Sequence, residues 1–174
     1  MADFPGKVNT QTSAAASQQG NIKMAVDVSF VRTIPAILMM AETVVGLLVW
    51  SLMASIHIFH PAIGWVMFVS VTLWLLTIVL FCMLLFGVHH KLPSVPWPLA
   101  VLVFNGVAAF LYLTAFITTA AVASDYYWTW AYGHMVAAAV FGCIVTVGYG
   151  ASAFFSYTMW RGNDGNAAGS TVPV

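Results

Sequence analysis

Charge is what this sequence has least of. Of its 174 residues, 6% are charged and 61% are hydrophobic, and the mean hydropathy is +0.93. Soluble domains carry about a quarter charged residues and about half apolar ones. The composition therefore excludes an ordinary soluble domain and indicates a chain embedded in a lipid bilayer. With five Lys and Arg residues in all, no nucleic-acid partner is expected.

Motifs of catalysis and metal binding are also missing. The sequence holds no Gly-rich phosphate loop, no HExxH and no GxSxG, and it offers no second intramembrane acid to act with Glu42. Cys82 and Cys143 fall at different depths of the expected helices, about 9 and 24 Å from the same membrane surface, so they are not expected to pair. No spacing fits a metal site. We expect no catalytic residue, no metal and no enzyme activity, and no cofactor beyond a bound cholesterol or sphingolipid.

Long apolar runs dominate what is present. Four of them exceed the roughly 20 residues that cross a bilayer as a helix, at residues 34–56, 62–88, 97–123 and 133–160. They lack the period-2 alternation of a membrane β-barrel. The sequence therefore predicts an all-α, four-helix transmembrane bundle over residues 30–160, and it predicts disorder in the polar tails at residues 1–29 and 161–174.

The basic residues predict the orientation of the chain. An even number of spans puts all five of them on one side of the membrane, namely Lys7, Lys23, Arg32, Lys91 and Arg161. Positive charge in short loops marks the cytoplasmic side. Both termini are therefore expected in the cytoplasm.

Glu42 is the residue that the first apolar run does not explain. Counted from Arg32 it lies about 15 Å into the membrane, where a charge is costly and a buried partner is expected. Similar depth counts for the other helices predict one polar layer made by Glu42, Thr77, Asn105 and Tyr149. We expect a protonated Glu42 that hydrogen-bonds Asn105 or Tyr149 and ties the first helix to the bundle. A transport role and a lipid or sterol contact stay open as alternatives.

Two further sets of residues are expected at the helix surfaces. Small residues recur every four positions along the fourth helix, at Ala138, Gly142, Thr146 and Gly150; such a stripe allows close helix packing, within the bundle or between copies of the chain. Tryptophans fall near the expected helix ends, where they anchor a helix at the membrane interface. They are Trp65, Trp97, Trp128, Trp130 and Trp160.

Several stretches resemble the MARVEL-domain family, namely GLLVW, GWVMFVSVTLWLLTIVLF, KLPSVPWPL, LYLTAF and YGASAFFSYTMWRG. The resemblance implies a tetraspanning protein with both ends in the cytoplasm, associated with cholesterol- and sphingolipid-rich membrane. It implies roles in vesicle formation, in apical or endosomal sorting and in myelin, at the plasma membrane and on endosomal and Golgi vesicles. Membrane lipids, further copies of the chain and cytoplasmic trafficking adaptors that bind the tails are the partners expected. An oligomeric potassium or proton channel that uses Glu42 is the alternative function.

Overall fold

The computed structural model describes residues 28–56, 60–88 and 96–169. Its four long helices are α2 (Ile34–Ala54), α3 (Pro61–Leu85), α5 (Trp97–Ala123) and α6 (Ala131–Gly169). A short helix, α1 (Val28–Val31), precedes α2, and a 3-10 turn, η1 (Ser124–Tyr126), follows α5. The described part of the chain contains no strand. All four long helices are long and apolar enough to span a membrane, which confirms the expected all-α, four-span fold.

Proline and local capping explain where the helices begin. Pro35, Pro61 and Pro98 each lie in the first turn of their helix, where the missing N–H of proline costs no hydrogen bond. The hydroxyl of Thr33 accepts from the Ala36 N–H at the start of α2. His60 does the same for α3 through Nδ1, which accepts from the Ala62 N–H at 3.2 Å.

The helix ends differ in places from the expected ones. Helix α3 stops at Leu85 rather than at residue 88, because Gly87 adopts a positive φ of 63° and its N–H bonds the Leu84 carbonyl, a common way to close a helix. Helix α6 continues past Trp160 to Gly169, so residues 161–169 of the expected disordered tail are helical. No proline occurs there to stop the helix. The other expected tail, up to residue 27, lies outside the described residues.

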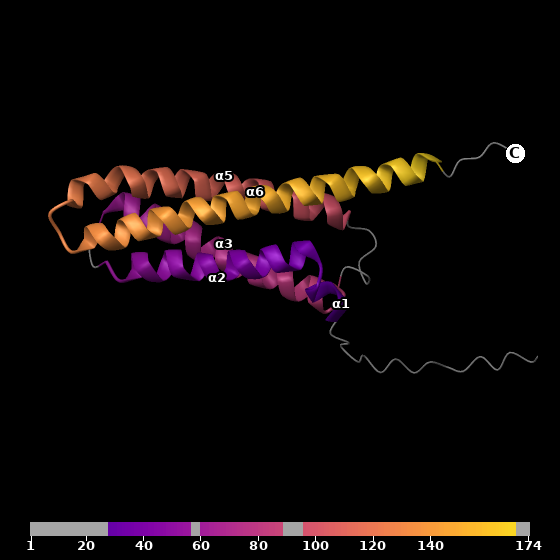
Figure 1. Cartoon of the computed structure of the whole chain (residues 1–174), viewed down its shortest axis with the longest axis horizontal. Coiled ribbons are helices and arrows are strands. Elements are labelled where there is room, and N and C mark those ends of the chain that lie inside the picture. Colours follow the sequence, from indigo (N-terminus) through magenta and orange to yellow (C-terminus); the bar gives the residue numbers. More distant parts are fainter. Residues whose placement is uncertain (1–27, 57–59, 89–95, 170–174) are drawn as a thin grey trace, which may run out of the picture.

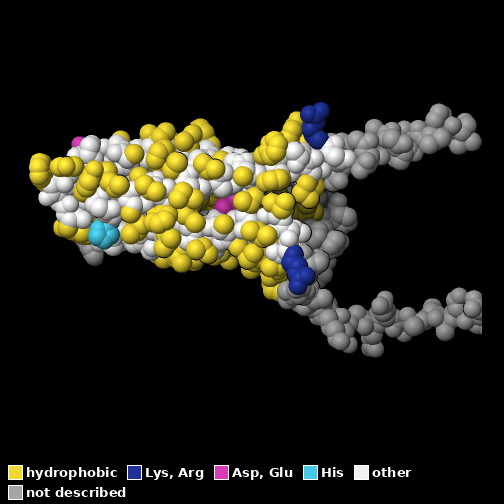
Figure 2. All heavy atoms as spheres, viewed as in Figure 1, with side chains coloured by type: hydrophobic (Ala, Val, Ile, Leu, Met, Phe, Trp, Pro, Cys, Tyr) yellow, Lys and Arg dark blue, Asp and Glu magenta, His cyan; other side chains and the backbone are white. Residues whose placement is uncertain are grey.

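The four helices form a closed ring in the order α2, α3, α5, α6, in which each packs against two neighbours. Figure 1 shows them side by side, with the start of α2 and the end of α6 at the same end of the bundle. Apolar side chains cover the middle of the visible face, and the coloured basic side chains lie toward the end of the bundle where α2 begins (Figure 2). The bundle therefore presents an apolar band to lipid and collects Arg32 and Arg161 at one end.

Candidate functional site

In each long helix most buried positions lie three or four residues apart. Steps of three and four residues alternate along α6. This spacing is that of helices that pack at a small crossing angle. Many of the side chains at these positions are small or polar, and we call the set the interior seam. On α6 it consists of Ala131, Met135, Ala138, Gly142, Val145, Tyr149, Ser152 and Ser156.

Glu42 lies on the interior seam of α2 with 3% of its surface exposed. Its Oε1 accepts a hydrogen bond of 2.5 Å from the Ser152 hydroxyl of α6. Gly148, one turn before Ser152, gives the acid room: a Cβ added there would lie 3.4 Å from Glu42 Cγ. Glu42 therefore joins the first spanning helix to the last through a side-chain bond inside the membrane.

The predicted partner of Glu42 was wrong. The Tyr149 hydroxyl bonds Thr77 Oγ1 instead, at 2.6 Å, and neither side-chain polar atom of Asn105 has a hydrogen-bond partner in the described part of the chain. Depth counting could have found Ser152, had it started from Ile34, where α2 begins. Glu42 is then about 12 Å deep, the depth of Ser152 counted from Trp160.

All four residues of the predicted polar layer lie inside the bundle. Thr77, Asn105 and Tyr149 are each 0 to 1% exposed. Tyr149 connects several helices, because it bonds Thr77 of α3 and its ring stacks on Tyr112 of α5 with centroids 5.6 Å apart. Side-chain hydrogen bonds thus link helices inside the bundle, from Glu42 to Ser152 and from Tyr149 to Thr77. The Tyr112 hydroxyl also donates to the Ser70 carbonyl of α3, at 3.5 Å.

A hydrogen bond between α2 and α3 was not expected. The indole N–H of Trp74 donates to the Thr43 carbonyl at 3.0 Å. That carbonyl belongs to the residue after Glu42, and the Trp74 ring also meets Trp50 edge-on at 5.5 Å. Sequence reasoning missed this bond because a tryptophan in the middle of an apolar run looks like any other apolar residue.

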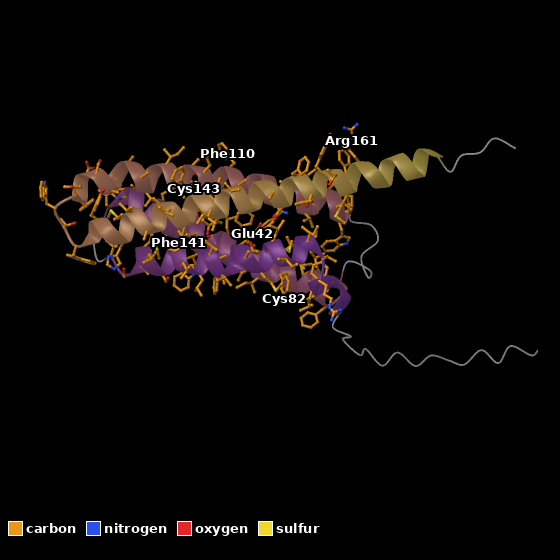
Figure 3. All side chains as sticks on the ribbon, in the orientation of Figure 1. Glu42, Cys82, Phe110, Phe141, Cys143 and Arg161 are labelled. Atoms are coloured by element: carbon orange, nitrogen blue, oxygen red, sulfur yellow. The ribbon has the colours of Figure 1, made fainter. Side chains whose placement is uncertain are left out.

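Glu42 also borders a groove on the outside of the bundle. Between α2 and α6 lies a groove of about 280 Å³ whose lining includes Leu38, Val45 and Gly148 beside Glu42. Its second oxygen, Oε2, has no hydrogen-bond partner among the described residues. An acidic side chain is visible through the apolar face in Figure 2, at the position that Figure 3 labels Glu42. The Glu42 side chain is thus buried but lies next to a groove that faces lipid.

The predicted small-residue stripe of α6 is split by the fold. Ala138 and Gly142 are buried, and Gly142 faces the backbone and Cβ of Phe116 on α5. Thr146 is half-buried, and Gly150 is exposed, where an added Cβ would meet no atom within 4 Å. A step of four residues turns a helix by about 40° beyond a full circle, so the stripe rotates out of the interior over three steps.

Four of the five predicted tryptophan anchors lie near helix ends, whereas Trp160 lies within α6, which continues to Gly169. Trp128 and Trp130 are 94% and 61% exposed in the connection between α5 and α6. Trp65 lies in the first turns of α3 and Trp97 begins α5. Trp160 lies one residue before Arg161, whose guanidinium is stacked over the Tyr157 ring at 5.7 Å. No group of three His, Cys, Asp or Glu residues able to hold a metal occurs among the residues described.

Comparison with known proteins identifies the fold family. The family model MARVEL, described as a membrane-associating domain, matches residues 30–155. The chain belongs to the MARVEL family. Plasmolipin of Danio rerio is 56% identical over the whole of both chains, and plasmolipin of Homo sapiens is 47% identical over 99% of this chain and 97% of its own. No solved structure matches.

A more distant relative covers most of the same MARVEL region. The CKLF-like MARVEL transmembrane domain-containing protein 8 of Homo sapiens is 37% identical over 88% of this chain and 92% of its own. The expected family is therefore confirmed, and the chain is a multi-pass membrane protein of the MARVEL type.

Proposed function

We propose that this MARVEL protein is a non-enzymatic organiser of cholesterol- and sphingolipid-rich membrane, acting in vesicle trafficking, in apical and endosomal sorting and in myelin. Helix length supports this proposal most directly. Helices α3 and α5 contain 25 and 27 residues, or about 38 and 40 Å of helix. The plasma membrane core is about 32 to 33 Å thick and that of the endoplasmic reticulum about 27 Å. Such helices fit thick, ordered membrane with less tilt than thin membrane.

The small extent of the protein outside the bilayer supports the same function. The connection between α5 and α6 consists of η1 and a few aromatic residues. It leaves no room for a folded domain on that side of the membrane. A protein built in this way acts through the lipids around it and through contacts between its helices. Association of copies is part of the proposal, and the α6 surface around the exposed Gly150 and the half-buried Thr146 is the place for it. Cytoplasmic trafficking adaptors would bind the tails.

Partition between lipid phases tests the main proposal. In giant vesicles with coexisting ordered and disordered phases, made of sterol, sphingomyelin and an unsaturated phosphatidylcholine, the labelled protein should concentrate in the ordered phase. Vesicles of a single phase serve as the control and should show an even distribution. Exclusion from the ordered phase would contradict the proposed function.

An oligomeric potassium or proton channel is the second candidate, favoured by one observation. Within the described ranges Glu42 Oε2 has no hydrogen-bond partner, and Glu42 borders the α2–α6 groove, where a neighbouring copy could cover it. Flux into liposomes across a pH or potassium gradient tests this function, with Glu42→Gln as the comparison. Flux that the substitution abolishes would make Glu42 the conducting residue, and flux no higher than in empty liposomes would eliminate the channel.

A further inference from the structure

A groove of about 600 Å³ lies between α5 and α6, near the end of the bundle opposite the start of α2. On α6 its lining runs from Tyr132 to Ile144, about 18 Å along the helix axis. One leaflet of hydrocarbon is about 15 Å thick. The groove therefore has the length of one lipid chain, extending from the interface to the middle of the membrane. Cys143, at its deep end, is labelled in Figure 3.

The two ends of this groove differ in chemistry. Small side chains line part of its length, at Ala120, Ala123 and Ala139. Hydroxyl groups gather at the interfacial end, at Ser124, Tyr127 and Tyr132. Neither phenol makes a side-chain hydrogen bond within the described residues. The groove thus matches an amphiphile whose apolar chain lies along alanine and whose polar head meets the free phenols.

Aromatic rings form a corner at the polar end. The Tyr127 ring meets Trp128 at 5.0 Å and 89°, and it meets Tyr132 at 5.0 Å and 67°. Tyr127 and Trp128 are exposed, so ring surface is open to a ligand. Quaternary ammonium groups bind such clustered ring faces through the negative charge of the π-system.

Charge at this end favours the same kind of ligand. Asp125 lies in η1 beside Ser124, and no Lys or Arg occurs between residues 96 and 156. His134 is the nearby histidine on α6, and its ring bonds the Trp130 carbonyl and meets the Trp130 ring edge-on. An anionic headgroup would meet an acid here without a permanent cation to balance it, whereas a choline would meet an acid and aromatic rings.

We propose that this groove is a binding site for a phosphocholine lipid. One acyl chain occupies the groove between α5 and α6, the trimethylammonium group contacts the rings of Tyr127 and Trp128 near Asp125, and the free phenols donate to the phosphate or the linkage oxygens. A general aromatic belt holds any interfacial lipid. This site differs in selecting the headgroup. The proposal requires only that the chain spans a membrane, and it is independent of the function proposed above.

Photo-crosslinking in nanodiscs tests the site. The full chain is placed in discs of equal phosphatidylcholine and phosphatidylglycerol, with a trace of either lipid carrying the same diazirine acyl chain. We expect adducts on the peptides that hold residues 116–124 and 132–144, with the choline probe exceeding the glycerol probe about threefold, as one exposed cation–π contact would give. Equal labelling of these peptides by the two probes would overturn the proposal.

Four variants separate this site from a general aromatic belt. Tyr127→Leu removes the ring and should bring the ratio close to one, while Tyr127→Phe keeps the ring and most of the preference. Ala120→Phe should lower labelling by both probes, because it fills a groove position that faces lipid. Trp130→Leu is the matched control, since Trp130 is exposed but does not line the groove. An equal loss of preference in Trp130→Leu and Tyr127→Leu would contradict a specific site.

Discussion

At the scale of single residues, the interior of this bundle is held by a few polar side chains in apolar surroundings. Ser and Thr hydroxyls along the helices mostly bond carbonyls of their own helix, as Ser156 bonds the Ser152 carbonyl. Other side chains reach a different helix, among them Ser152, Tyr149, Trp74 and Tyr112. A hydrogen bond between membrane helices is worth about 0.6 to 2 kcal/mol. These links therefore specify which helix faces meet, while close packing supplies the rest of the attraction.

The Glu42–Ser152 bond predicts different results for two substitutions. Glu42→Gln keeps an oxygen that can accept from Ser152, and it should leave stability nearly unchanged. Glu42→Leu removes the acceptor and should cost about 1 kcal/mol, or about 2 to 4 °C in the melting temperature of a chain of this size. Thermal unfolding in detergent measures both, with the lipid-facing Val44→Leu as the control. Equal melting of the Gln and Leu variants would show that the bond does not stabilise the bundle.

At the scale of single helices, hydrophobicity does not distinguish the interior seam from the face that meets lipid. Every face of a spanning helix is apolar, because one face meets lipid and the other meets protein. Size is what distinguishes the two faces here. Gly46 of α2 illustrates this: a Cβ there would lie 3.2 Å from the Tyr112 hydroxyl of α5. Small residues mark the seam, but the four-residue stripe predicted for α6 followed it only at Ala138 and Gly142.

Two glycines of α6 give a matched pair of substitutions. Gly142→Leu should destabilise the bundle by about 1 to 3 kcal/mol, because the new side chain would press on Phe116 and the α5 backbone. Gly150→Leu meets open space and should change stability by no more than about 0.5 kcal/mol. Unfolding in detergent compares the two. Comparable destabilisation by both variants would mean that the Gly150 face is packed within the bundle.

The same pair separates packing inside the bundle from association between copies. Chemical crosslinking of the membrane-embedded chain reports the fraction of oligomer. If copies associate through the outer face of α6, Gly150→Leu should lower that fraction while its melting temperature stays that of the original chain. An unchanged fraction would remove this face as a contact between copies.

At the scale of the whole molecule, the ring of helices α2, α3, α5 and α6 places the start of α2 and the end of α6 at one end of the bundle. Single cysteines test which side that is, in a chain where Cys82 and Cys143 are replaced by Ala. With the positive-inside orientation, cysteines at Ser55 and Ser124 should react with an impermeant reagent added outside intact cells. A cysteine at Ser94, which lies outside the described residues, should react only after permeabilisation. Reaction at Ser94 from outside would invert the predicted topology.

The sequence by itself determined the membrane location, the four spans and their order. Helix α5 begins at Trp97 and ends at Ala123, the bounds read from the sequence, because prolines precede it and Ser124 and Asp125 follow the apolar run. These features are local or depend only on length and hydropathy. The stretches that resemble the MARVEL family likewise identified the family without a structure.

Tertiary structure alone decided which residues meet. The sequence shows that Glu42 is an acid at a position where burial is costly. That it bonds Ser152 rather than Asn105 or Tyr149 depends on the relative rotation and height of α2 and α6. A shift of one turn along a helix, about 5.4 Å, exchanges one candidate partner for another. Burial of apolar surface does not set this rotation in lipid, where both faces of a helix are equally well solvated. The close fit of small residues such as Gly148 against their neighbours sets it, and that fit exists only once the helices are packed.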